Sequence, residues 1–452
     1  MSTRAPARSP GRVRAIVGAT VGHTIEFFDF TVYGFLAVHI GATFFPSEDP
    51  TAELLSSFAV FGLAFLARPL GGFVLGPLAD RIGRKRVLVL VLTVMAACSV
   101  GIGVLPGYDS WGIAAPLVLV LLRTLQGFSA GGEYGSGSAF LLEYAGPNRR
   151  AFGISWLTFG TTAGLMLGIT VVTGLTAALG DATMADWGWR IPFLLAAPLA
   201  GIALYIRAKL EETPDFRTMS ETGSLSTSPA REVLGRGRRL ALIVGIGAMH
   251  ATCFYAVFTY MPTYIGTVND YGSTFSLVST MCAGLATMVT LPLVARLSDR
   301  IGRRPVLLAG SLGFAVLVFP VFAAITLGNP VLALASQLAL GILTAVYLSA
   351  SAAAMPELFP AAIRSTGVSI GFNIPAAVFG GSAPFVATFL IQQTGWTPAP
   401  SIYLLFTAIC GAVAACLLKG SDLHADDLVD IDESRATALP AATLRRSPDP
   451  IH

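Results

Sequence analysis

The chain is built from a series of continuous apolar stretches, which short polar connections separate. A helix of roughly 20 apolar residues crosses the hydrocarbon core of a bilayer and satisfies its own backbone hydrogen bonds there. The stretches do not alternate polar with apolar residues, as membrane-spanning β-strands do. Only 12% of the residues are charged, about half the share that is typical of soluble domains. The sequence therefore predicts an all-α membrane protein with about 12 transmembrane helices. We expect them near residues 13–40, 54–78, 87–105, 114–142, 151–179, 189–208, 240–265, 274–295, 305–326, 330–352, 365–391 and 401–418.

Two distant segments spell nearly the same basic loop, GPLADRIGRKR at 76–86 and ARLSDRIGRRP at 295–305. Such a repeat indicates an internal duplication, and in a membrane protein it predicts two similar bundles with a substrate site between them. We therefore expect two pseudo-symmetric six-helix bundles. The expected parts are an N-terminal tail (1–12), a first bundle (13–206), a polar linker (207–239), a second bundle (240–418) and a disordered C-terminal tail (419–452).

Basic residues collect on one side of this predicted topology, in the N-terminal tail, in the linker and in the two repeated loops. On the opposite side, Arg190 is the one basic residue of the loops. Because positively charged loops stay in the cytoplasm, we expect a multi-pass protein of the plasma membrane with both termini cytoplasmic. The arginines form short juxtamembrane clusters, which argues against nucleic-acid binding. The first apolar stretch is too long for a signal peptide and contains acids, so we expect it to be retained as a helix.

Five further segments carry distinctive motifs: EFFDFTVYGF at 26–35, RPLGG at 68–72, RTLQGFSAGGEY at 123–134, WGWRIPF at 187–193 and LEETPDF at 210–216. Together they resemble the metabolite:proton symporter family of the major facilitator superfamily. Two further segments, SWL at 155–157 and TYMPTY at 259–264, are most similar to the proline/glycine-betaine type within that family. The resemblance implies a proton-coupled symporter that imports a small carboxylate or zwitterion by alternating access, with an osmolyte such as proline or glycine betaine favoured. An organic-acid symporter for 2-oxoglutarate, citrate or shikimate is the alternative, and a drug/proton exporter is disfavoured because the fifth helix has no GPxxGG element.

A few ionisable residues interrupt the apolar stretches, and such residues are usually functional because they are costly to bury in hydrocarbon. His23, Glu26, Asp29 and Tyr33 share one face of the first helix; Arg123, Gln126 and Glu133 share a sector of the fourth; Arg68 lies near the middle of the second. A symporter needs a carboxylate whose proton affinity changes with hydration and with nearby cations. We expect Glu26, Asp29 and Glu133 to serve in proton coupling, with His23 as a relay. The alternative is that these acids form ion pairs that only hold helices together.

Arg123 is the expected anchor for a substrate carboxylate, because a guanidinium binds both oxygens at once. Arg68 is the second candidate, and the alternative for Arg123 is a permanent pair with Glu133 or with an acid of the first helix. Tyr33 and Gln126 are further candidates for the substrate site. The cationic end of a betaine or of proline would suit aromatic faces. Candidates are Trp156, Phe254, Tyr255 and Tyr260, although apolar packing is the commoner use of such rings.

The family resemblance also implies that the two repeated loops form a cytoplasmic gate. We expect Asp80 and Asp299 to follow helix ends and to lie near a helix N-terminus, and Arg84 and Arg303 to pair with Glu143 and Glu357. The alternative is that the arginines only determine topology. Glycines at four-residue spacing in the fourth and fifth helices predict close helix packing. They are Gly127, Gly131 and Gly135, and Gly160, Gly164 and Gly168.

Other classes of function have little support in the sequence. There is no GxSxG or HExxH motif and no phosphate-binding loop, so we expect neither an enzyme nor ATP-driven transport. The five cysteines form no CxxC pair, which argues against a metal site. A receptor or scaffold remains open but does not explain intramembrane acids. We expect no cofactor other than the proton motive force, with sodium as the alternative ion, and function as a monomer.

Overall fold

A computed structural model describes residues 10–268 and 271–423, and within these ranges the chain is helical, without strands. Within the described residues, eleven helices are long and apolar enough to cross a membrane. Helices α1 (Pro10–Phe35) and α2 (Ala37–Phe44) meet at a 65° bend, and counting this pair as one span gives twelve. The predicted all-α membrane architecture is confirmed.

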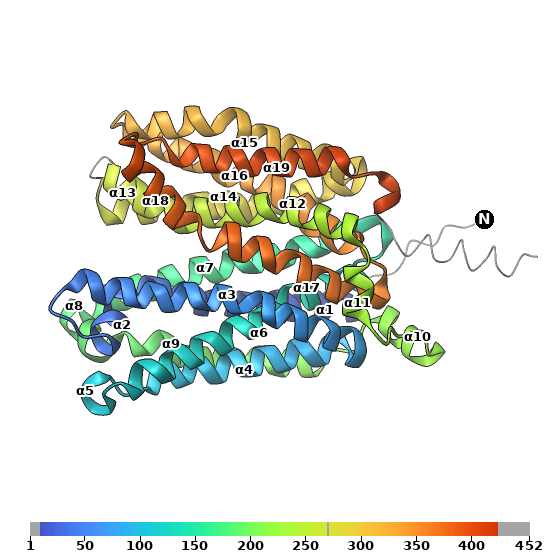
Figure 1. The fold of residues 1–452 in the computed structure, drawn as a ribbon, viewed down its shortest axis with the longest axis horizontal. Coiled ribbons are helices and arrows are strands. Elements are labelled where there is room, and N and C mark those ends of the chain that lie inside the picture. The colour runs from blue at the N-terminus through green and yellow to red at the C-terminus, as the bar shows by residue number, and fades with distance from the viewer. Residues whose placement is uncertain (1–9, 269–270, 424–452) are drawn as a thin grey trace, which may run out of the picture.

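The helices form two bundles, which lie one above the other in Figure 1. Besides α1 and α2, the spans of the N-terminal bundle are α3 (Pro50–Ile82), α4 (Arg84–Val104), α6 (Ala114–Ala145), α7 (Arg150–Leu179) and α9 (Arg190–Ala208). Those of the C-terminal bundle are α12 (Gly237–Tyr255) continued by α13 (Met261–Val268), α14 (Gly272–Ile301), α15 (Arg303–Thr326), α16 (Pro330–Glu357), α17 (Arg364–Pro375) continued by α18 (Ala383–Thr394), and α19 (Pro400–Leu417). The bundles meet where α17 packs on α3 and α6, and where α14 and α16 pack on α7.

Each repeated basic loop consists of a single non-helical residue, Gly83 between α3 and α4 and Gly302 between α14 and α15. The φ angles are +111° at Gly83 and +93° at Gly302, a region that is strained for residues with a Cβ atom. This explains why both copies carry a glycine there. The sequence suggested that Asp80 and Asp299 follow the helix ends. They lie instead within the last turns of α3 and α14, because these helices extend further than their apolar stretches. We call this end of the molecule the basic-loop end.

The expected boundaries of the parts differ from the helix ends. Helix α1 begins at Pro10, inside the predicted tail 1–12, and α9 continues through Arg207 to Ala208. The linker contains two short helices, α10 (Pro214–Thr222) and α11 (Pro229–Leu234), which Figure 1 shows at the basic-loop end. The acidic tail beyond residue 423 lies outside the described residues, so its predicted disorder stays a prediction.

The two glycine series bring neighbouring helices into close contact, as predicted. A Cβ atom on Gly131 of α6 would lie 2.1 Å from the carbonyl oxygen of Arg68 on α3, and one on Gly164 of α7 would lie 2.2 Å from that of Thr24 on α1. These contacts hold α1 and α3 against the rest of the N-terminal bundle. They therefore help to place the polar residues of both helices inside the protein.

Candidate functional site

The polar face of α1 is turned into the N-terminal bundle. His23, Glu26, Asp29 and Tyr33 are all buried, as the periodicity of the helix predicted. Their neighbours on α3, α4 and α6 divide into two groups. We call these the Asp29 cluster and the Glu26 cluster.

The Asp29 cluster consists of Asp29, Ser99, Arg123 and Gln126. The carboxylate of Asp29 accepts hydrogen bonds from Ser99 Oγ at 2.5 Å and from Gln126 Nε2 at 2.7 Å, and Arg123 Nη1 lies 3.5 Å from it. Arg123 Nη1 also donates to Gln126 Oε1 at 2.7 Å. The ring of Tyr33 lies 3.8 Å from the Arg123 guanidinium carbon. Arg123 is thus paired with an acid of the first helix, which is the arrangement weighed as the alternative for Arg123.

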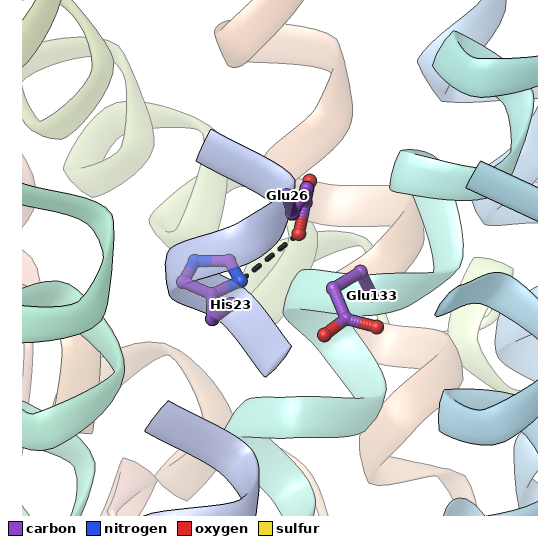
Figure 2. Close-up of side chains that lie close together, drawn as sticks. All are labelled: His23, Glu26 and Glu133. Carbon is purple, nitrogen blue, oxygen red and sulfur yellow. Dashed lines mark ion pairs between the residues drawn. The ribbon is translucent and has the colours of Figure 1, made fainter. Parts of the chain in front are cut away.

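The Glu26 cluster consists of His23, Glu26 and Glu133 (Figure 2). His23 Nδ1 lies 3.0 Å from Glu26 Oε2. One ring nitrogen of His23 and one carboxylate oxygen from each acid all lie within 4.8 Å of one another. Arg207 of α9 pairs with Glu133 at 2.6 Å, and Arg68 Nη2 lies 3.9 Å from Glu26 Oε1. These two guanidinium groups balance the charge of the two acids. The cluster therefore suits a proton, which moves between neutral and charged partners, better than a metal cation.

Arg68 lies between the Glu26 cluster and the C-terminal bundle. Its guanidinium carbon is 4.6 Å from the ring centre of Phe30 and 4.8 Å from that of Phe65. Tyr255 of α12 packs against Phe65 with ring centres 5.3 Å apart and interacts electrostatically with Arg68. Within the described residues, Nε and Nη2 of Arg68 have no hydrogen-bond partner. Arg68 is thus a buried cation at the contact between the bundles, held near Glu26 by an ion pair of 3.9 Å.

The C-terminal bundle contributes an aromatic wall to this contact. Phe254 packs edge-to-face on Phe27 of α1, at 5.8 Å, and on Tyr255, at 5.5 Å. Directly after Tyr255, a π-helical turn, η3 (Ala256–Tyr260), widens the helix. A second π-helical turn, η5 (Ala376–Gly380), follows α17, and Gly380 there lies against the ring of Tyr255. Such turns are frequent at functional sites because they redirect side chains.

Two of the predicted aromatic candidates, Trp156 and Tyr260, pack against other aromatic rings. Trp156 packs on Phe152 and Phe159 of its own helix, with ring centres 6.1 Å and 5.1 Å away. Tyr260 packs on Tyr264 at 5.9 Å. Neither ring has a recorded contact with the Asp29 or Glu26 cluster among the described residues. The sequence could not show how α7 would orient the ring of Trp156 or how the π-helical turn η3 would orient that of Tyr260.

At the basic-loop end, Asp80 of the N-terminal bundle caps the first turn of α17 in the other bundle. It accepts hydrogen bonds from the backbone nitrogen atoms of Thr366, at 2.8 Å, and Ser365, at 3.3 Å. Arg84 Nη2 lies 3.5 Å from Asp80 and 3.3 Å from Glu143. Glu143 also pairs with Arg364 of the C-terminal bundle at 3.0 Å. The expected pair of Arg84 and Glu143 is therefore present and continues across the interface.

The second repeat makes the equivalent contact in the opposite direction. Asp299 of the C-terminal bundle accepts hydrogen bonds from the backbone nitrogen atoms of Ala151, at 2.9 Å, and Phe152, at 3.0 Å, at the start of α7. Arg303 pairs with Asp299 at 2.9 Å and binds both oxygens of Glu357, at 2.7 and 3.0 Å. Negative charge at a helix N-terminus is stabilising. Each bundle thus places one aspartate on a helix of the other and closes this end of the molecule.

Sequence reasoning missed several residues of these networks. Arg207 was counted with the basic linker, because it stands at the end of an apolar stretch, yet it is 2% exposed inside the bundle. Ser99 and Arg364 carry no signal of their own, since a serine in an apolar helix and an arginine beside a loop are both common. His250 of α12 is buried beside Ser351, with Nδ1 2.8 Å from its hydroxyl oxygen. A search for every ionisable residue inside or at the edge of an apolar stretch would have found Arg207 and His250.

Known proteins match the chain over almost its whole length. Residues 15–238 match the model of the sugar (and other) transporter family and residues 268–449 that of the major facilitator superfamily. The chain is 36% identical to the proline/betaine transporter of Escherichia coli (strain K12), over 90% of this chain and 84% of that protein. It is also 36% identical to the citrate-proton symporter of Klebsiella pneumoniae, over 90% of this chain and 92% of that protein.

The fold is also that of a solved transporter. The structure of the proton:xylose symporter XylE bound to 6-bromo-6-deoxy-D-glucose superimposes with a TM-score of 0.74, at 18% identity, over 90% of this chain and 95% of that chain. Two bundles, paired basic loops and buried ion pairs agree with these similarities. The chain belongs to the major facilitator superfamily of secondary transporters, in the group that includes proline/betaine transporters and citrate-proton symporters.

Proposed function

We propose that this protein is a proton-coupled symporter that imports a small zwitterion or carboxylate across the plasma membrane by alternating access. A proline- or glycine-betaine-like osmolyte is the favoured substrate. The observation that carries the proposal is the position of Arg68, which approaches Glu26 on one side and meets the C-terminal bundle, at Tyr255, on the other. One cation thus serves both the proton-binding cluster and the contact where bundles of this fold bind substrate.

This position supplies a coupling mechanism. A substrate carboxylate that accepts hydrogen bonds from Nε and Nη2 of Arg68 competes with Glu26 for the same guanidinium. When Arg68 turns to the substrate, Glu26 loses a stabilising positive charge while it stays buried. The loss of that charge favours the protonated form of Glu26. Uptake of the proton by Glu26 leaves the loaded site nearly neutral, which lowers the cost of enclosing it between the bundles.

The aromatic wall favours a zwitterion. With its carboxylate on Arg68, a small zwitterion would direct its cationic end towards Phe65, Phe254 and Tyr255. Aromatic faces attract quaternary ammonium groups. A second candidate is an organic acid. It is favoured by Arg123, whose Nε and Nη2 have no partner in the described part of the chain, and by the similarity to the citrate-proton symporter.

The same proposal covers orientation and assembly. The arginine-rich basic-loop end faces the cytoplasm, so both termini are cytoplasmic and the contacts of Asp80 and Asp299 close the cytoplasmic side. Each chain contains both bundles and a complete set of charged groups, and it functions as a monomer without a bound cofactor. The energy source is the proton gradient.

Transport by purified protein in liposomes tests this function. Radiolabelled proline, glycine betaine, citrate, 2-oxoglutarate and shikimate are offered with an inward pH gradient, with an inward sodium gradient, or with neither. We expect accumulation of proline or glycine betaine driven by the pH gradient and abolished by a protonophore. Accumulation of citrate instead would favour the organic-acid candidate, and accumulation only with sodium would replace the coupling ion. If no gradient drives any of these solutes, the proposed function is wrong.

A further inference from the structure

Arg207 forms an intramembrane ion pair with Glu133 that the coupling of Arg68 with Glu26 does not use. It stands near the end of α9 and reaches α6, where Nη2 and Nη1 lie 2.6 and 3.5 Å from the two oxygens of Glu133. The side chain is 2% exposed and that of Glu133 is also 2% exposed. It occupies the space beside Gly22 of α1, where a Cβ atom would lie 2.1 Å from Nη2. Arg207 is therefore fixed against the helix that carries His23 and Glu26.

The two members of this pair depend on each other unequally. Arg207 also donates to two backbone oxygens, of Leu88 at 2.7 Å and of Gly18 at 3.5 Å. For the side chain of Glu133, the hydrogen bonds found within the described residues all come from Arg207. Neutral Glu133 would leave Arg207 with acceptors, whereas Glu133 without Arg207 would be a buried charge without a partner. Protonation of Glu133 can thus separate this pair without leaving Arg207 short of acceptors.

Glu133 is also within reach of the proton-binding groups. Its carboxylate and the donor atoms of His23 and Glu26 lie within 4.8 Å of one another. The other charged or titratable groups near it are Arg68 of α3, which faces Glu26, Tyr134 of α6, whose ring is 6.3 Å from that of His23, and His250 of α12, which packs on Tyr134. The imidazole of His23 therefore lies within a short distance of both carboxylates.

We propose that Glu133 is the second station of the transported proton and that Arg207 is the positioning residue that determines when Glu133 accepts and releases it. The proton leaves the Glu26 carboxyl group, passes through the imidazole of His23 and binds an oxygen of Glu133. Arg207 keeps its own protons and its two backbone hydrogen bonds throughout. Release of the proton towards the cytoplasm restores the pair of Glu133 and Arg207. This inference rests on the proposed symport and adds a residue and a step to it.

The test compares two kinds of transport in liposomes, with proline, glycine betaine, citrate and 2-oxoglutarate as probes. Counterflow exchanges labelled for unlabelled solute and needs no net proton movement, whereas accumulation under a pH gradient does. We expect Glu133→Gln to keep counterflow and to lose gradient-driven accumulation. Arg207→Lys should keep both. Arg207→Gln should keep counterflow but require a more alkaline lumen for half-maximal net uptake, by roughly one pH unit or more, because Glu133 then holds its proton more firmly.

The double variant Arg207→Gln/Glu133→Gln removes both charges and keeps the test valid if Arg207→Gln folds poorly. It should behave as Glu133→Gln alone does. Arg217→Gln, on the exposed surface of α10, is the control and should behave as the wild type. Gradient-driven accumulation by Glu133→Gln at the wild-type level, or an unshifted pH profile for folded Arg207→Gln, would overturn the inference while the symport stands. If the wild type moves no protons with any probe, the proposed function fails first, and this inference fails with it.

Discussion

At the scale of single residues, the structure gives different surroundings to acids that look alike in the sequence. Asp29 has three polar donors, Glu133 has one arginine, and Glu26 has a histidine at 3.0 Å and a guanidinium at 3.9 Å. Of the three, Glu26 is the acid whose guanidinium neighbour, Arg68, also meets the C-terminal bundle. Its surroundings are therefore the ones that substrate binding at Arg68 would change.

The first prediction concerns Glu26. We expect Glu26→Gln to retain counterflow and to lose coupling, so that a gradient of one pH unit, which can sustain about tenfold accumulation, sustains none. The measurement is the ratio of internal to external labelled solute in liposomes at steady state. Glu221→Gln, an exposed acid of α10, is the matched control. Wild-type accumulation by Glu26→Gln would remove Glu26 as the proton carrier.

The second prediction separates the two candidate anchors. Loss of a charge-assisted hydrogen bond costs about 1.5–3 kcal/mol, so Arg68→Ala should raise the half-saturating substrate concentration in counterflow about 10- to 100-fold. Arg68→Lys should recover part of this loss, because it keeps the charge but not the planar fork. Arg123→Gln should instead reduce the yield of folded protein, since it leaves Asp29 without its ion-pair partner. Unchanged half-saturation in Arg68→Ala would reject Arg68 as the anchor.

At the scale of helices, small residues decide how closely the elements approach. The glycines of α7 follow the backbone of α1, and those of α6 follow α3 and, at Gly135, α17 of the other bundle. In hydrocarbon, close backbone contact is a principal source of attraction between helices, because apolar side chains gain little over lipid. The face of α1 that carries the acids is therefore placed by contacts on its opposite side, along α7.

The third prediction tests this packing on a single helix. A Cβ atom at Gly164 would lie 2.2 Å from a carbonyl oxygen of α1, whereas nothing lies within 4 Å of one at Gly174. We expect Gly164→Ala to destabilise the protein by about 1–3 kcal/mol through overpacking and to lower its melting temperature in detergent. Gly174→Ala on the same helix should be neutral or slightly stabilising. Equal melting temperatures for the two variants would contradict the close contact.

At the scale of the whole molecule, the repeated loops join the bundles by reciprocal contacts. Asp80 holds the first turn of α17, and Asp299 holds the first turn of α7. The two contacts lie at the same end and must both break for that end to open. When the bundles rock apart, the carboxylates of Asp80 and Asp299 leave the helix N-termini and become hydrated. The strength of the two capping contacts therefore sets the balance between the open and closed states.

The fourth prediction addresses this balance. Removal of one charged cap costs about 0.5–2 kcal/mol, so Asp80→Asn or Asp299→Asn should increase the open fraction at the basic-loop end about 2- to 30-fold. Spin labels on the exposed residues Ile82 and Ile301, in a background without the native cysteines, measure the separation of the bundles there. Asp109→Asn, on the exposed short helix α5 (Tyr108–Trp111), is the control. If both aspartate variants give the wild-type distance distribution, the caps do not hold the gate.

The sequence alone was enough for the architecture, because long apolar stretches have no stable alternative to helices in a bilayer and a repeated loop reveals a duplication. It also predicted that α1 turns its polar face inwards, since that face follows from the helical period. It could not show that Arg207 pairs with Glu133, or that Arg68 meets the C-terminal bundle at Tyr255 while Arg123 pairs with Asp29. Those relations depend on how far each helix extends and how it is rotated against its neighbours. That packing is decided by contacts between segments far apart in the chain, and only the tertiary structure contains it.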